Sequence, residues 1–307
     1  MTTRLATVTF RKPARRPCRI GTPSETKMPD LSFQQVDVFS SKPFKGNPVA
    51  VVIGADDLSE RQMADFAKWT NLSETTFLLA PTTPQADYRL RIFTPSGELP
   101  FAGHPTLGTC HAWLTSGGRP RSEVIVQECG VGLVAVRRLE GRLAFAAPKL
   151  LRTGPVEEAL LDRIANGLRI ARSAILDAQW ADNGPGWVAV QLGSRAEVLS
   201  LDPDHAALGD LKLGVVGAWD EAQDGTEAQF EVRAFAMGVG VKEDPVTGSL
   251  NAGLAQWLIG NGRAPRSYVA SQGTALGRAG RIHVDQIGDD IWIGGDTMTN
   301  ISGTVSF

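Results

Sequence analysis

The order of predicted elements in the first half of this 307-residue chain is repeated in the second half. In the first half, a predicted strand that ends at Phe93 is followed by the glycine-rich segment GHPTLGTCHAWL (103–114) and then by further strands. In the second half, a predicted strand that ends at Phe235 is followed by EDPVTGSLNAGLAQWL (243–258) and then by another β segment. Each glycine-rich turn leads into a helix that ends in Trp-Leu. An internal repeat of this kind predicts two similarly built lobes rather than one continuous sheet.

The hydrophobic pattern predicts short strands that alternate with a few helices. Ser59 followed three residues later by Gln62 is a capping-box arrangement, which predicts that a helix begins there. A second amphipathic helix is predicted over 156–168, where Val156 and Leu160 share one apolar stripe. Strands are predicted at 33–39, 49–53, 70–79, 87–93, 123–128, 132–138, 143–147, 186–192, 213–219, 230–236, 281–285, 290–294 and 303–307.

These patterns divide the chain into four segments. We predict a basic tail over 1–30, an N-terminal lobe over 31–148, a C-terminal lobe over 149–295, and a terminal strand over 296–307 that returns to the N-terminal lobe. The first 29 residues contain seven Lys or Arg, one Glu and four prolines, and they lack the apolar core of a secretory signal. This tail is interpreted as disordered, or as an upstream start that precedes a true start at Met28. An organelle transit peptide is the alternative.

The composition excludes several classes of function. With 42% hydrophobic and 21% charged residues, the chain is expected to be a soluble globular protein. A net charge of −2 gives no reason to expect nucleic acid or an anionic membrane as a partner. The three cysteines contain no CxxC pair, which favours a reducing, cytoplasmic setting. The four histidines form no HxH or HExxH cluster, so no metal site is predicted.

Both glycine-rich turns are candidates for binding an anion. Pro105 lies near the start of the first helix, where its missing N–H matters least. Thr247, Gly248 and Ser249 lie at the start of the second helix. Unpaired N–H groups and the positive end of the helix dipole make each start suitable for a carboxylate. Either turn alone is also a common helix cap, but two such starts facing one cleft would grip a small carboxylate-bearing ligand.

Glu74 is out of place in the apolar stretch TNLSETTFLL (70–79). A buried carboxylate is unfavourable unless it is paired, hydrogen-bonded or protonated. Burial would raise its pKa toward neutrality and would make it a candidate general base. The alternative is a carboxylate that is capped by Thr75 or Thr76, or exposed at the end of a strand.

His104 and Asp244 are the other candidates for acid–base chemistry. His104 lies between Gly103 and Pro105 and could relay a proton or orient a substrate, although a lone histidine is more often structural. Asp244 could act in catalysis or simply cap the following helix. Ser249 is placed to donate a hydrogen bond to a ligand, although serine is also common in the first turn of helices.

Four motifs in this order give the chain a resemblance to the PhzF-like family of phenazine-biosynthesis isomerases, over about residues 31–307. They are VDVFSSKPFKGNPVAVV, NLSETTFLL, FTPSGELPFAGHPTLG and EDPVTGSLNAGLAQWL. The resemblance implies an α+β, diaminopimelate epimerase-like fold. In that fold each of two similar lobes is a mainly antiparallel β-sheet or barrel around a central helix, and the active site lies between the lobes.

The resemblance also implies roles for individual residues. Glu74 corresponds to the residue that transfers the proton, and His104 and Asp244 correspond to its catalytic partners. The expected substrate-binding residues are Gly103, Pro105, Thr106, Gly248, Ser249, Gln272 and Gly273. One departure is Ser271, which stands where an acidic residue is usual.

Epimerases and racemases of this shape use one cysteine at each glycine-rich turn, whereas these turns carry His104 and Asp244. The residues therefore favour a cofactor-independent isomerase, without metal, nucleotide or redox group. It would move one proton within a small carboxylate-bearing substrate, and the resemblance implies a reaction similar to the isomerisation of trans-2,3-dihydro-3-hydroxyanthranilate. A homodimer is expected. The alternatives are an epimerase or racemase that uses acid residues, and a non-catalytic metabolite-binding protein.

Overall fold

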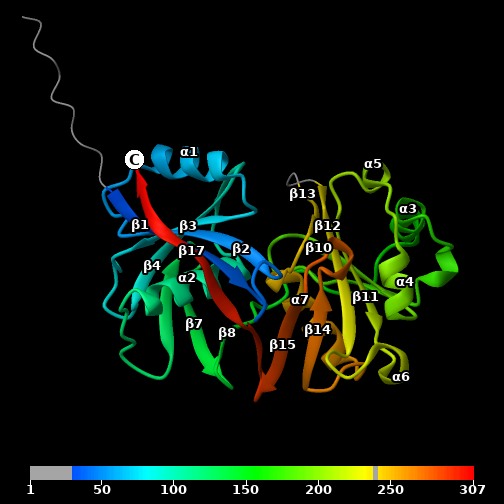
Figure 1. Ribbon diagram of the computed structural model, residues 1–307. Coiled ribbons are helices and arrows are strands. Elements are labelled where there is room, and N and C mark those ends of the chain that lie inside the picture. Colours follow the sequence, from blue (N-terminus) through cyan, green and yellow to red (C-terminus); the bar gives the residue numbers. More distant parts are fainter. Residues whose placement is uncertain (1–29, 238–240) are drawn as a thin grey trace, which may run out of the picture.

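The computed structural model describes residues 30–237 and 241–307, so all of the predicted basic tail except Asp30, the first residue of β1, lies outside the described residues. Figure 1 shows two halves side by side, each with strands around one central helix, α2 in one half and α7 in the other. The first half contains β1 (Asp30–Val38), β2 (Asn47–Ile53), α1 (Glu60–Thr70), β3 (Thr75–Leu79), β4 (Tyr88–Thr94), β5 (Gly97–Leu99), α2 (Gly103–Thr115), β6 (Ile125–Cys129), β7 (Gly132–Leu139) and β8 (Arg142–Ala146).

The second half repeats this order with additional short helices. It contains α3 (Glu158–Leu168), η1 (Arg172–Ala174), β9 (Asp177–Trp180), β10 (Trp187–Leu192), α4 (Arg195–Ser200), α5 (His205–Leu208), β11 (Lys212–Ala218), α6 (Glu221–Asp224), β12 (Phe230–Ala236), β13 (Val241–Asp244), α7 (Gly248–Gly260), β14 (Ser267–Gln272), η3 (Thr274–Leu276), β15 (Gly280–Ile287) and β16 (Asp290–Gly295). The last strand is β17 (Thr297–Ser306).

Strand pairing confirms that the two halves share one topology. In the first half, β2 pairs with β3 and β4 pairs with β6 in parallel, while the other pairs are antiparallel. In the second half, β10 pairs with β11 and β12 pairs with β14 in parallel, at the equivalent places in the order. The predicted two-lobed α+β class is therefore correct.

The prediction that the lobes do not share a sheet is wrong. Strand β8 pairs antiparallel with β16, and this pairing joins all the strands into a 17-stranded sheet. These two strands occupy the same place in the two halves, so the junction brings like elements together. Strand β17 returns to the first half, where it pairs with β1 from Asp30 opposite Ser306 to Val38 opposite Thr297. Hydrophobic periodicity within each half carries no information on such pairings between distant strands.

The central helices are apolar on nearly all sides, which is the pattern of a helix enclosed by other elements. Nine residues of α2 and nine residues of α7 are buried. Both helices contribute to one hydrophobic cluster that extends through both lobes. None of the helices within 30–237 and 241–307 combines the length and the apolar character needed to cross a membrane.

The region around Glu74 differs from the prediction of one strand over 70–79. Helix α1 begins after Ser59, whose predicted capping box with Gln62 is present, and it continues to Thr70. Asn71 then ends the helix in the left-handed conformation, with φ of 53°. Strand β3 begins only at Thr75. Glu74 therefore lies at the end of a short loop, immediately before a fully buried strand.

Candidate active site

The N-terminal ends of α2 and α7 meet at two glycines. A Cβ atom on Gly248 would lie 3.3 Å from the Cα of Gly103. A Cβ atom on Gly103 would lie 2.6 Å from the ring of Phe145, so a side chain does not fit there. The N-cap residues, Ala102 and Thr247, provide no side-chain cap to either helix. The first-turn N–H groups of both helices are therefore left for solvent or a ligand.

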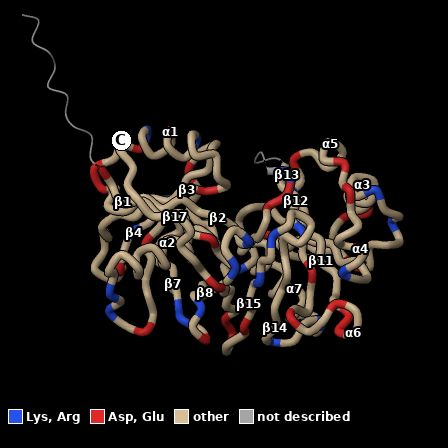
Figure 2. The backbone as a smooth tube through the Cα atoms, viewed as in Figure 1, with Lys and Arg blue, Asp and Glu red and all other residues tan. Residues whose placement is uncertain are grey.

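The two helices provide no charge of their own near this meeting point. Neither α2 nor α7 contains Lys, Arg, Asp or Glu, and both are drawn tan in Figure 2, while charged residues are spread over the surrounding elements. An anion bound where the helices meet would therefore be held by backbone N–H groups and by the positive ends of two dipoles.

Glu74 and His104 face each other beside this meeting point. Oε2 of Glu74 lies 3.4 Å from Nε2 of His104, the second residue of α2. Only 16% of the Glu74 side chain and 5% of the His104 side chain are exposed. Both atoms are buried, and neither has a hydrogen-bond partner within the described part of the chain. Buried polar atoms are normally satisfied, so an orphaned pair of this kind indicates a place where a ligand or water completes the site.

The ionisation of the site follows from its burial. Burial raises the pKa of Glu74 to about 8, and the negative charge of Asp244 adds to the increase. Burial lowers the pKa of His104 to about 3, and a hydrogen bond to the Pro48 carbonyl opposes only part of this. Burial also raises the pKa of Asp244 to about 6, against two side-chain hydrogen bonds that lower it. At neutral pH Glu74 is then mostly protonated, His104 is neutral and Asp244 is mostly ionised.

Asn47 connects the two lobes inside the site. Its Nδ2 donates to Oδ1 of Asp244 at 3.1 Å and to the carbonyl of Val246 at 2.8 Å, and it lies 3.4 Å from Nδ1 of His104. Asn47 is the first residue of β2 and is fully buried. The strands predicted at 33–39 and 49–53 leave Asn47 in the connection between them, and its role in the site was not predicted. Its contacts depend on a strand from one lobe meeting a turn from the other.

Asp244 is held from its own lobe by a buried polar network. Oγ1 of Thr247 donates to Oδ2 of Asp244 at 2.6 Å. Gln272 donates to the carbonyl of Asp244 at 3.0 Å and to Oγ1 of Thr247 at 2.9 Å. Its Oε1 accepts from the N–H of Thr247 at 3.0 Å and from Asn251 at 2.9 Å. Gln272, fully buried, therefore supports the turn, and its amide is already engaged by protein groups.

The remaining predicted binding residues either can donate to a ligand or support the protein around the site. Ser249 accepts a hydrogen bond from Nε1 of Trp187 at 3.0 Å, which leaves its own O–H free to donate to a ligand. Gly273 has φ of 89°, and a Cβ atom on it would lie 2.6 Å from the carbonyl oxygen of Pro245, so it supports the turn.

Thr106 and Pro105 lie in the first turn of α2, and both are buried. Oγ1 of Thr106 accepts from Gln127 at 3.1 Å within the core of the lobe. The structure therefore brings Glu74, His104 and Asp244 together, and it turns the Thr106 hydroxyl toward the protein interior.

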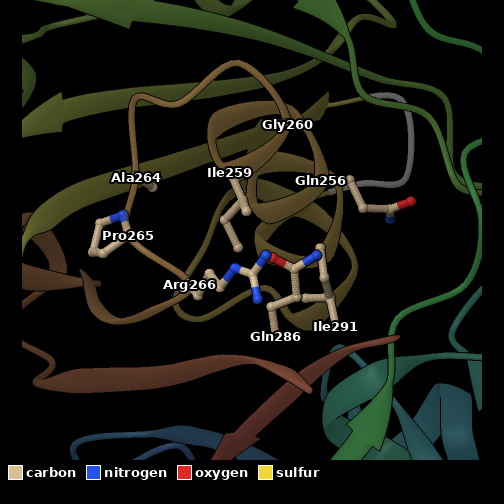
Figure 3. Close-up of a pocket in the computed structure, with 8 residues that line it drawn as sticks. All are labelled: Gln256, Ile259, Gly260, Ala264, Pro265, Arg266, Gln286 and Ile291. Carbon is tan, nitrogen blue, oxygen red and sulfur yellow. The ribbon is translucent and has the colours of Figure 1, made fainter. Parts of the chain in front are cut away.

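A cavity of about 630 Å³ lies away from these residues. It is at the C-terminal end of α7, where Ile259, Gly260, Arg266 and Ile291 are among the residues that line it (Figure 3). The 12 residue steps from Gly248 to Gly260 correspond to roughly 18 Å along the helix. None of the predicted site residues lines this cavity, so the candidate site is formed by the polar groups between the lobes.

The fold and the site together define a class of protein. Two topologically equivalent lobes, each built around an apolar helix, join their helix starts beside buried acid groups. This is the diaminopimelate epimerase-like architecture. A hydroxyproline epimerase from Agrobacterium vitis shares the fold, with a TM-score of 0.53 at 16% identity over 90% of this chain and 92% of the epimerase.

More similar proteins place the chain within one family of that class. The family model described as phenazine biosynthesis-like protein (PhzC-PhzF) matches residues 36–304, and the chain belongs to this family. A solved PhzF-family structure from Enterococcus faecalis has a TM-score of 0.74 and 26% identity, covering 91% of this chain and 100% of that protein.

Two curated relatives differ in how they are described. Antisense-enhancing sequence 1 of Schizosaccharomyces pombe is 39% identical over 300 residues, which cover 90% of this chain and 99% of that protein. The trans-2,3-dihydro-3-hydroxyanthranilate isomerase of Pseudomonas aeruginosa is 35% identical over 254 residues, which cover 81% of this chain and 87% of the isomerase. The chain is an isomerase of the PhzF family.

Proposed function

We propose that this isomerase moves a proton within a small, cyclic, carboxylate-bearing metabolite similar to trans-2,3-dihydro-3-hydroxyanthranilate, and that Glu74 carries the proton. The observation that carries the proposal is the buried contact between Glu74 and His104, whose facing atoms have no other partner in the described residues. The similarity to the Pseudomonas isomerase supports the substrate class.

In the proposed reaction, the substrate carboxylate lies at the helix starts around Gly103 and Gly248. The N–H groups of both helices and the O–H of Ser249 bind it. Glu74 in its ionised form takes a proton from one carbon and returns it to another carbon of the same molecule, which shifts a double bond. A carboxyl group with a pKa near the working pH suits both steps, because it accepts and donates a proton with little bias. His104, neutral and buried, orients the carboxyl group of Glu74.

The Glu74→Gln variant tests this proposal. Wild type and variant are incubated in D₂O with cyclic hydroxy acids that include trans-2,3-dihydro-3-hydroxyanthranilate, and the products are followed by NMR. We expect wild type to shift the double bond, and to incorporate deuterium in those turnovers in which the Glu74 carboxyl group exchanges its proton with solvent before returning it. The variant should lose about 10²–10⁴-fold of this turnover, the typical contribution of a positioned proton carrier, while its affinity for the acid remains.

The control is Glu123→Gln, which changes an exposed glutamate and should leave turnover unchanged. Turnover retained by Glu74→Gln would remove Glu74 from its proposed role. Deuterium at a stereocentre with inversion of configuration, instead of a shifted double bond, would show an epimerase and overturn the isomerisation.

A further inference from the structure

Strand β13 carries two adjacent carboxylates, Glu243 and Asp244, of which only Asp244 enters the site. The strand has four residues, and it pairs with β12 at Asp244 opposite Ala234 and at Val241 opposite Ala236. The register shifts between these two pairs. Such a short, irregular pairing specifies its register weakly by backbone hydrogen bonds alone.

A buried ion pair holds Glu243 on the opposite face. Nε and Nη2 of Arg233 donate to Oε1 and Oε2 of Glu243 at 2.9 and 2.8 Å, a bidentate arrangement. The exposed fractions of the two side chains are 7% and 9%. Nη1 of Arg233 also donates to the carbonyl of Leu201 at 2.7 Å, and the guanidinium lies 5.0 Å from the centre of the Phe235 ring.

Adjacent residues of a strand point to opposite faces, so a slip of one residue exchanges them. If β13 slipped by one position to place Glu243 where Asp244 now lies, Lys242 would occupy the position beside Arg233. A second cation would then replace a bidentate carboxylate next to a buried guanidinium. Arg233 therefore favours the observed register by attraction to Glu243 and disfavours the slipped one by repulsion of Lys242.

We propose that the Arg233–Glu243 pair is a register lock for β13, which makes Asp244 rather than Glu243 the carboxylate that meets Asn47. Arg233 and Glu243 are positioning residues, because they act on the site only through Asp244. On the other side of Asp244, the hydrogen bond from Gln272 to its carbonyl fixes the turn but not the strand that precedes it. The catalytic part of this inference rests on the proposed function, whereas its structural part does not.

Three variants separate a register role from a general effect of losing an ion pair. Arg233→Met leaves the largely buried carboxylate of Glu243 without its cation, and we expect kcat/KM to fall at least tenfold. Arg233→Met/Glu243→Leu places apolar groups on the face of β13 where the ion pair lies, and it gives the strand an apolar–polar alternation. The kcat/KM of this double variant should therefore recover to within threefold of the wild-type value. Arg195→Met is the control. Arg195 is the first residue of α4, and it pairs with Asp224 and with the fully buried Glu231 of β12, so its loss breaks ion pairs next to β12 without touching β13.

Crystal structures of the same variants give a readout that needs no substrate. In Arg233→Met we expect Asp244 to lose its contact with Nδ2 of Asn47, which is 3.1 Å in the wild-type chain. In the double variant that contact should return. If wild type turns over no candidate acid, the proposed function fails while these structures still decide the register lock.

Two results would overturn the lock. One is an Arg233→Met structure in which Asp244 still accepts the hydrogen bond from Nδ2 of Asn47. The other is a double-variant structure in which the contact between Asp244 and Asn47 is as disrupted as in Arg233→Met. The position of Asp244 would then depend on the charge of Arg233 itself or on its hydrogen bond to the carbonyl of Leu201. If Arg233→Met does not fold, the double variant alone decides, because the lock requires that it folds with Asp244 in place.

Discussion

The chemistry of Glu74 depends on what surrounds one carboxyl group. Its loop brings it against the first turn of α2, where His104 is neutral and cannot offer a positive charge. Asp244 from the other lobe adds a negative charge. Desolvation and a like charge act in the same direction, and both favour the protonated acid. The same glutamate at the exposed end of a strand would be an ordinary ionised side chain.

This environment predicts a measurable dependence of stability on pH. The pKa of Glu74 is raised from 4.5 to about 8 in the folded state. Between these values the folded state binds the proton more strongly than the unfolded state does, so folding stability falls as pH rises through this window. Glu74→Gln removes that dependence. Relative to wild type, the free energy of unfolding of the variant should increase by on the order of 2 kcal/mol between pH 5 and pH 9. This is less than the full pKa shift of Glu74 implies, because the side chain is partly exposed.

Urea unfolding of wild type and Glu74→Gln at both pH values measures this gain. The exposed Glu123→Gln serves as control and should show no such difference. Equal gains at pH 5 and pH 9 would contradict a raised pKa at position 74.

At the scale of elements, the site depends on how closely α2 and α7 approach each other. Their first residues are glycines that touch, and the ring of Phe145 fills the space beside them. A side chain at either position would push the two helix starts apart. It would also move the N–H groups that face the proposed carboxylate site.

We therefore expect Gly103→Ala to destabilise the protein and to impair ligand binding. The new Cβ would lie 2.6 Å from the Phe145 ring, which is too close without a shift of that ring or of the helix. Overpacking of this kind costs typically 1–3 kcal/mol. Thermal unfolding and the affinity for the candidate acids measure the two effects.

Gly260→Ala is the matched control at the other end of α7, where a Cβ atom would meet nothing within 4 Å. It should be neutral or stabilising by up to about 1 kcal/mol, as expected for alanine in a helix. A Gly103→Ala variant as stable and as competent in binding as wild type would show that the close contact of the helix starts is not required.

At the scale of the whole molecule, neither lobe is closed by its own strands. The first half needs β17 from the end of the chain to cover β1, and its β8 pairs with β16 of the second half. The hydrophobic cluster around α2 and α7 extends through both lobes. The lobes are topological repeats, but their stabilising contacts are shared.

We expect the described fold to unfold in one cooperative transition. Calorimetry should give equal calorimetric and van't Hoff enthalpies, and fluorescence and circular dichroism should report the same midpoint. The separate fragments 30–148 and 149–295 should not give cooperative unfolding of their own. Two resolved transitions in the intact chain, or a fragment that folds alone, would contradict this shared core.

The order of amino acids alone was enough to predict the repeated order of elements, the capping box at Ser59 and the two glycine-rich helix starts. It also determined that Glu74 is a carboxylate in an apolar stretch. These features depend on near neighbours along the chain, since propensity, periodicity and capping act within a few residues.

Contacts between distant segments were settled by three-dimensional packing. It placed Glu74 before β3 rather than within it, joined β8 to β16, and brought Asn47 to Asp244. It also placed Arg233 against Glu243, which a pattern of charges along the chain does not reveal. Each of these contacts forms when segments far apart in sequence are packed together. The energies of these contacts depend on burial and on the distance between the contacting groups, and a pattern along the chain specifies neither.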